Sequence, residues 1–345
     1  MSDKTGIAWT NATWNPVTGC TKVSQGCKHC YAEREWARLS ANPKATTYYG
    51  RAFTDVACHE DRLDQPLRWT KPRLIFVNSM SDLFHEDVPD DFIDRVFAVM
   101  ALAPQHTFQV LTKHPNRMLR WFEPGYDNRE HAVGQAMREI AASRGGDDAG
   151  LPEWPLPNVW LGVSVEDQAT ADVRIPLLLQ TPAAVRWVSA EPLIGPICMD
   201  ECPVGMFGPL RPYGGTGTDT PKLDWIVVGG ESSFLKARSM RAEWVRSIIQ
   251  QCREADTPIF VKQLGSNFMD CEQGIVSAAT SVQDQESVRH AIWKRGRLWT
   301  HTVGVIDPPV RVLSNRAGAN MDEWPEDLRV REWPERAVVI DKVSI

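Results

Sequence analysis

Three cysteines in one short loop are the residues of this sequence best suited to chemistry. Cys20, Cys27 and Cys30 lie in the segment WNPVTGCTKVSQGCKHCYAE with the spacing Cys-x6-Cys-x2-Cys. Gly19 and Gly26 each directly precede a cysteine, which favours a loop able to turn its thiols toward one centre. Cysteine thiolates are ligands for zinc and for iron–sulfur clusters. We therefore predict a metal site held by these three cysteines.

The loop offers no obvious fourth ligand. A structural zinc site has four protein ligands, whereas a 4Fe–4S cluster bound by three cysteines leaves one iron free to bind another molecule. His29 could complete a zinc site, but it is adjacent to Cys30, and neighbouring side chains rarely converge on one tetrahedral ion. We favour the open cluster. A zinc site and three unrelated reduced cysteines are the alternatives.

Composition sets the broad class of the protein. Its 345 residues are 24% charged and 43% hydrophobic, which excludes wholesale disorder, and its net charge of -6 argues against nonspecific coating of DNA. The sequence has no apolar run of membrane-spanning length and no signal peptide at its start, so we expect a cytoplasmic protein with no membrane contact. Cytosolic thiols stay reduced, which favours a metal or catalytic role for the cysteine loop over disulfides.

Short β-rich runs alternate with helix-like segments along the chain, a pattern typical of an α/β fold with a mainly parallel sheet. We expect one barrel over residues 1–268 and a C-terminal extension over residues 269–345 that packs on it. The strand candidates are 73–82, 106–114, 158–167, 185–192, 224–232 and 258–266, with a weaker one at 6–14. The helix candidates are 31–39, 89–103, 241–252 and a segment within 127–150.

Every one of the six clear strand candidates ends in polar residues. In parallel α/β folds, ligands bind at the carboxyl ends of the strands, so these side chains are candidates for an active site. Each could instead be only a helix cap or a solvated turn residue. The residues are Ser79, Ser81 and Asp82; Lys113 and His114; Ser164, Glu166 and Asp167; Ser189 and Glu191; Glu231 and Ser232; Lys262 and Gln263.

With these features, the sequence resembles the radical S-adenosylmethionine (SAM) superfamily. More narrowly, it resembles a radical-SAM-like family of phage and bacterial proteins of unknown function with a three-cysteine motif. The common superfamily spacing is Cys-x3-Cys-x2-Cys, and here the first gap is six residues. The matching segments are the cysteine loop, VNSMSDLFH, LGVSVED, WVSAEPLIGP, WIVVGGES, FVKQLG and DEWPEDLRVREWPE.

The resemblance implies a partial (β/α)6 TIM-like barrel of radical SAM type that holds a 4Fe–4S cluster through Cys20, Cys27 and Cys30. It also implies binding of SAM, its reductive cleavage to a 5'-deoxyadenosyl radical, and a reducing protein partner such as flavodoxin or ferredoxin. Asp82 would bind the SAM amino group, helped by Ser79 and Ser81. Further expected SAM contacts are Ser164 and Glu166 on the ribose or carboxylate, and His29 or Tyr31 on the adenine. Candidate substrate contacts or proton-transfer groups are Lys113, Glu191, Glu231 and Lys262.

One further segment of the sequence indicates a class of substrate. SVRHAIWKRGRLW, at 287–299, interleaves basic and aromatic residues, which could grip phosphates and stack bases. We therefore expect a nucleoside or a nucleic-acid base as substrate, for modification or repair. A solvated basic face is the plainer interpretation of the segment. The rival function is a noncatalytic nucleic-acid-binding or interaction protein with a structural metal in the cysteine loop.

Overall fold

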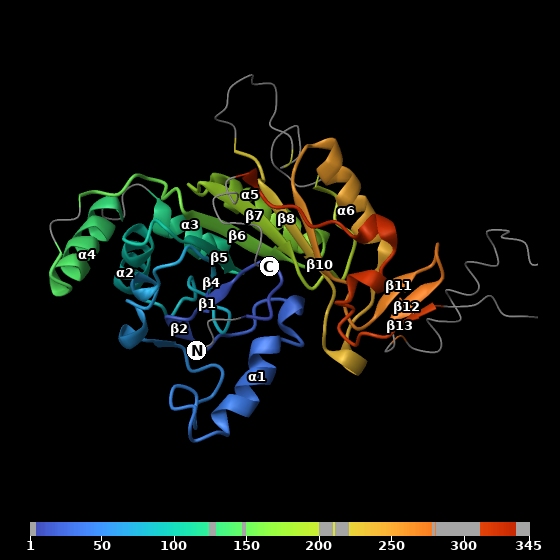
Figure 1. Ribbon diagram of the computed structural model, residues 1–345, viewed down its shortest axis with the longest axis horizontal. Helices are drawn as coiled ribbons and strands as arrows, with labels where there is room; N and C mark the ends of the chain where they lie inside the picture. The colour runs from blue at the N-terminus through green and yellow to red at the C-terminus, as the bar shows by residue number, and fades with distance from the viewer. Residues whose placement is uncertain are drawn as a thin grey trace, which may run out of the picture.

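Seven parallel strands form the central sheet of the computed structural model, which describes residues 5–123, 129–146, 150–199, 210, 221–277, 280 and 311–335. The sheet curls into a half-barrel, which is compatible with the expected partial TIM-like barrel (Figure 1). All seven strand candidates are confirmed, the weaker first one included. In spatial order the strands are β1 (Ala12–Trp14), β4 (Leu74–Val77), β5 (Thr107–Thr112), β6 (Val159–Val165), β7 (Val185–Ala190), β8 (Trp225–Gly229) and β10 (Ile259–Gln263).

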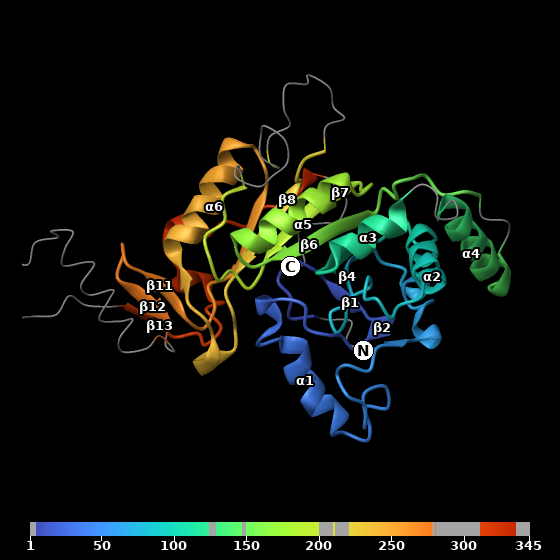
Figure 2. The same ribbon diagram turned by 180° about the vertical axis from the view of Figure 1, so that it is seen from behind.

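Helices follow most of these strands and cover the outer face of the curl, whereas α1 projects away from the sheet (Figures 1 and 2). The four helix candidates are confirmed, and α3 and α5 are additional. Asp167 begins α5 with a capping box, in which its carboxylate accepts from the backbone of Thr170. The helices are α1 (Tyr31–Ser40), α2 (Asp90–Ala101), α3 (Pro115–Phe122), α4 (Arg129–Ser143), α5 (Gln168–Gln180) and α6 (Ala242–Glu254).

Alternate residues of each strand pack on opposite faces of the sheet, as the two-residue period of a strand requires. The outward residues join α2, α5 and α6 in the main core. The inward residues change in character along the strand: β6 carries Trp160, Gly162 and then Ser164, and β8 carries Trp225, Val227 and then Gly229. An aromatic cluster thus closes the amino end of the inner face, and small or polar residues lie at the carboxyl end. The cluster consists of Trp9, Phe76, Trp160, Val185, Trp187, Trp225, Val227 and Phe260.

Residues 324–331, within the predicted C-terminal extension, pack on the last strand of the sheet. Val261 donates its backbone N–H to Val330, Arg331 pairs with Phe260, and Trp324 is buried in the main core. A second sheet, in the order β13-β12-β11-β9, joins residues on both sides of position 268, so the boundary between barrel and extension stays a prediction. Its strands are β9 (Met240–Arg241), β11 (Phe268–Asp270), β12 (Ile275–Ser277) and β13 (Arg311–Leu313); β2 (Val17–Thr18) and β3 (Ala57–Cys58) form a separate pair.

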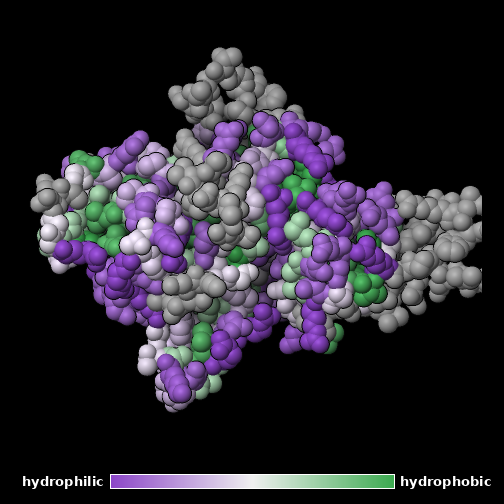
Figure 3. Space-filling model, viewed as in Figure 1, coloured by the Kyte–Doolittle hydropathy of each residue, from purple (hydrophilic) through white to green (hydrophobic). Residues whose placement is uncertain are grey.

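Most of the glycine- and proline-rich stretch at 196–222 lies outside the described residues, and so does the whole basic and aromatic 287–299 segment. Within the described part of the chain, no helix is long and apolar enough to cross a membrane. On the face shown in Figure 3, the coloured surface is mostly hydrophilic, and its apolar areas are small and separate.

A buried ion network joins α2 to α4. Asp94 of α2 accepts from the indole N–H of Trp121 at 3.1 Å and lies 3.3 Å from the guanidinium of Arg129. Burial raises the pKa of Asp94 to about 6, since it outweighs the opposing effect of Arg129. Ionisation of Asp94 is therefore less favourable in the folded protein than in the unfolded chain.

We expect this carboxylate to make stability depend on pH. Because the folded-state pKa lies above the ordinary value of 3.8, its stabilising contribution is complete below about pH 4 and is lost as the pH rises through about 6. Asp94→Asn mimics the protonated form and removes this loss. Between pH 4.5 and 7 the free energy of unfolding should fall by about 1–2 kcal/mol more in the wild type than in the variant, a figure reduced for solvent screening. Urea unfolding at each pH measures this free energy. The same change with pH in the wild type and the variant would contradict the raised pKa of Asp94.

Candidate functional site

The cysteine loop starts at the carboxyl end of β1 and runs beside the end of β4. Gly19 donates its backbone N–H to Met80, and Cys20 donates to Phe53. Gly19 has a φ of +93°, and a Cβ there would lie 2.3 Å from the carbonyl oxygen of Asp55, so only glycine fits this turn. The loop therefore opens at the edge of the sheet where the polar strand ends gather.

The three thiols share one environment. Cys27 is buried and Cys20 and Cys30 are partly buried, with Cys30 packed against Ala32, Trp36 and Met80. Burial, followed by the charges of Asp82, Cys27 and Cys30, raises the pKa of Cys20 to about 12. In the conformation described, no three His, Cys, Asp or Glu side chains among the described residues form a group that could hold a metal ion. The thiols influence one another electrostatically without forming an assembled ligand set.

One side of the loop rests on Glu166, at the end of β6. Its fully buried carboxylate accepts from Ser24 of the loop at 3.0 Å, and it lies 2.7 Å from the ammonium of Lys113 and 3.2 Å from the guanidinium of Arg174. A Cβ on Gly26 would lie 2.2 Å from this carboxylate, so the loop backbone packs directly on it. Burial alone would raise the pKa of Glu166, but Lys113 and Arg174 bring it below its ordinary value. Glu166 is held as an anion.

The other side of the loop rests on Glu231, after β8. This buried carboxylate lies 3.1 Å from Nδ1 of His29 and 2.6 Å from the guanidinium of Arg238. Arg238 also donates to the carbonyl oxygen of Gln25, in the short 3-10 turn η1 (Gln25–Cys27), at 2.8 Å. Burial opposes ionisation, but hydrogen bonds from Arg238 and His29 hold the pKa of Glu231 below its ordinary value.

Glu191, directly after β7, and Lys262, on β10, form a third pair. The ammonium lies 3.0 Å from the carboxylate, which also accepts from Ser189 at 3.2 Å. The strand between them, β8, ends in Gly229, where a Cβ would lie 2.3 Å from a carboxylate oxygen of Glu191. Because Gly229 has no side chain, Glu191 and Lys262 can approach each other across β8. Both side chains remain partly exposed at the carboxyl end of the sheet.

The predicted SAM-binding segment after β4 is tied to its neighbours. Asp82 is buried and accepts from the hydroxyl of Thr112 at 2.7 Å and from the backbone of Lys113 at 2.8 Å. Ser81 donates to the carbonyl of Val17 at 2.7 Å, and Ser79 donates to Asn15 at 3.1 Å.

The remaining predicted SAM contacts lie at the same edge. The hydroxyl of Tyr31 donates to the carbonyl of Ser79. Ser164 is buried on the inner face of β6, and its carbonyl accepts from Arg174 at 2.6 Å. The structure therefore brings the predicted cofactor and substrate residues together with the three cysteines, in or beside the strand ends.

Several residues at this edge carry no signal in the sequence that marks them for the site. Asn15 accepts hydrogen bonds from the backbone of Met80 and from the hydroxyl of Ser79. It belongs to the same motif as the cysteines, but its residue type alone does not indicate a role in the site. Arg174 follows Glu166 by eight residues, and Arg238 follows Glu231 by seven. Neither spacing predicts an ion pair until the fold is known.

Two histidines also lie near the loop. The rings of His85 and His114 contact each other with their centres 5.5 Å apart. His85 is 2.8 Å from the hydroxyl of Thr21, the residue beside Cys20. His114, a strand-end candidate, is thus linked to the cysteine loop through His85.

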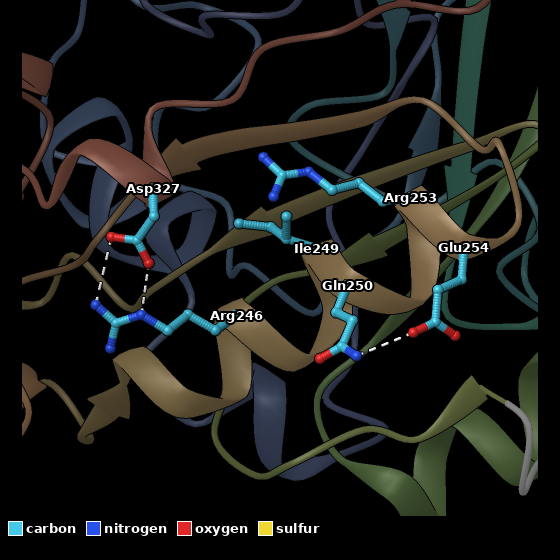
Figure 4. A pocket seen from close by; sticks show the side chains of 6 residues that line it. All are labelled: Arg246, Ile249, Gln250, Arg253, Glu254 and Asp327. Carbon is cyan, nitrogen blue, oxygen red and sulfur yellow. Dashed lines mark hydrogen bonds and ion pairs between the residues drawn. The ribbon is translucent and has the colours of Figure 1, made fainter.

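A separate pocket lies on the outer surface, between α6 and the 3-10 turn η7 (Glu326–Leu328) (Figure 4). It has a volume of about 320 Å³, and two of its charges are already paired, Arg246 with Asp327 at 2.5 Å. None of the predicted site residues lines it. The lining residues are Arg246, Ile249, Gln250, Arg253, Glu254 and Asp327.

Comparison with known proteins identifies a family. Residues 4–323 match the family model described as a protein of unknown function, DUF5131. A search of curated proteins found no match, and a search of solved structures found none. Because the matched region covers most of the sequence, this chain belongs to the DUF5131 family of proteins of unknown function.

Proposed function

We propose that this protein is an iron–sulfur enzyme of radical SAM type. One observation carries the proposal: a loop with three cysteines is docked at the carboxyl ends of the parallel strands of a half-barrel, where α/β barrels bind their ligands. The resemblance of the cysteine loop and the strand-end segments to the radical SAM superfamily supports the same function.

The residues present fit a 4Fe–4S cluster by their donor chemistry. Cys20, Cys27 and Cys30 supply three thiols from one loop, and Cys27 and Cys30 contribute to the raised pKa of Cys20. Iron–sulfur clusters are held by thiolates, and three of them leave one iron for an outside ligand. When bound and reduced, such a cluster supplies the electron that cleaves SAM to methionine and a 5'-deoxyadenosyl radical, which takes hydrogen from a substrate.

The chain's own residues would bind SAM and keep water out. The charge of Asp82 helps to raise the pKa of Cys20, and Oδ2 of Asp82 accepts a hydrogen bond from Lys113 with capacity left for an ammonium group. Gly162 lets Trp187 pack directly on β6, so the aromatic cluster closes the amino end of the inner face to water. Glu191 and Lys262 are the polar groups placed to contact a substrate at the open end.

The substrate we propose is a nucleoside or a nucleic-acid base, and SAM, a reducing protein such as flavodoxin or ferredoxin, and this substrate are the expected partners. The support for it is the composition of the 287–299 segment, which offers cations for phosphates and indoles for base stacking.

A structural zinc site is the second candidate, and one contact favours it. The Nδ1 atom of His29 lies 3.1 Å from Glu231, and zinc-binding histidines commonly hold a carboxylate through the ring nitrogen that does not bind the metal. His29 Nε2 could then complete a site with the three cysteines. This arrangement would serve a noncatalytic nucleic-acid-binding or interaction protein.

Release of 5'-deoxyadenosine tests the proposed activity. Protein purified and reduced with dithionite under anaerobic conditions should form it from SAM even without substrate, because reductive cleavage proceeds to some extent uncoupled. The Cys58→Ala variant, altered outside the loop, should release it at the same rate. Protein that holds a full cluster and forms none would overturn the SAM assignment.

A further inference from the structure

We infer that Glu166 and Glu231 are positioning residues, two buried carboxylates that hold the cysteine loop in place before any metal binds. This role rests on and deepens the proposed function, because the segment they hold separates Cys20 from Cys30. It also reassigns both residues: the resemblance places Glu166 on SAM and Glu231 among the substrate or proton-transfer groups, whereas their contacts are with the loop and with cations.

The contacts of Glu231 reach the loop at two points. The ring of His29 is within hydrogen-bond distance of one carboxylate oxygen. The second contact runs through Arg238, which donates to the carbonyl oxygen of Gln25. Arg238 itself is fixed by its backbone N–H and its guanidinium, which both donate to Glu231 at 2.6–3.1 Å. The carboxylate therefore orients the arginine that grips the loop.

Glu166 holds the same segment from another strand of the sheet. Ser24 donates to it, and the backbone at Gly26 lies against it too closely for any side chain. Lys113 donates to the same carboxylate oxygen as Ser24, and Arg174 donates to both oxygens, so the two cations offset the negative charge. Residues 24–29 are thus held by two separate anions, one at the end of β6 and one after β8.

The loop needs such anchors because its own bonding is local. Cys27 donates to Ser24 and Lys28 donates to Gln25, each across three residues. Of the residues between Ser24 and His29, Cys27 is the one with a buried side chain. These backbone bonds fold the loop on itself and do not tie it to the sheet. Charge-assisted hydrogen bonds to buried carboxylates supply that connection.

Amide hydrogen exchange on the full-length, metal-free protein tests this positioning role. In Glu231→Gln and in Glu166→Gln, the amides of Cys27 and Lys28 should exchange at least tenfold faster than in the wild type, and their exchange should speed up by a larger factor than that of the amides of β6 and β8. Glu191→Gln is the matched control, because it alters a carboxylate at the same edge whose contacts are with Lys262 and Ser189 instead of the loop. It should leave the loop unchanged.

The outcomes separate the possibilities. Unchanged loop exchange in both variants would overturn the positioning role. Exchange that speeds up by the same factor in the loop and in the strands would also overturn it, because it would show only a general loss of stability. Iron uptake by the same proteins addresses the proposed function independently: if the loop responds as expected and no protein binds iron, the positioning role stands and the iron–sulfur assignment fails.

Discussion

Replacing Cys27 by alanine should reduce the iron and sulfide of anaerobically reconstituted protein at least tenfold and remove its brown colour. Cys27 is the buried member of the three cysteines and lies between the two anchored points of the loop. Two thiolates from one loop are too few for a stable 4Fe–4S cluster, which draws its protein ligands from cysteine. Iron and sulfide analysis with visible absorption spectra measures the effect.

Two control variants make this result specific. Cys58→Ala and Cys252→Ala remove thiols outside the loop, one on β3 and one in the core face of α6, and both should keep wild-type iron content if they fold. Equal iron in Cys27→Ala and the wild type would exclude the loop as the site. Loss of iron in all three variants would point to a general effect of cysteine removal on folding.

Replacing Glu166 by alanine should lower the free energy of unfolding by about 3–5 kcal/mol at pH 7, the usual cost of removing one partner from a buried ion pair. Arg174 is itself buried and would be left with an uncompensated charge, whereas Lys113 can move toward solvent. The loss should shrink as the pH falls. The folded-state pKa of Glu166 lies below its ordinary value, so its contribution is present at neutral pH and is lost as the pH falls through that lowered pKa.

Urea unfolding of Glu166→Ala beside Glu191→Ala measures this difference. Glu191 pairs with a lysine that is 22% exposed, so its removal leaves a charge that water can reach and should cost at most about 1 kcal/mol. Similar losses in the two variants would show that burial of the Glu166 network does not govern its energetics.

Much of this architecture can be predicted from the sequence, because the strands are short β-rich runs of the kind that parallel sheets bury. The runs at 158–167 and 224–232 contain β6 and β8, and the polar residues that end them lie at one edge of the sheet. The Cys-x6-Cys-x2-Cys spacing likewise marks a loop that the structure places at that edge. These features are local, so a single sequence carries them.

The contacts that hold the site together cannot be predicted in the same way. Ser24 and Glu166 are 142 residues apart, and Gln25 and Arg238 are 213 apart, so no local pattern links them. From the sequence alone, Glu166 and Asp82 are candidates for ligand binding, because the sequence does not show which side chains they pair with. Pairing with Lys113 and Arg174, or with Thr112, is decided only when the sheet brings neighbouring strands together.

Metal analysis of the wild-type protein isolated without oxygen tests the central claim most directly. If the cysteine loop binds a 4Fe–4S cluster, the protein will be brown and contain roughly four iron and four sulfide ions per chain, with Mössbauer spectra typical of this cluster and no significant zinc. A colourless protein with one zinc ion per chain would contradict the claim and favour the closed site completed by His29.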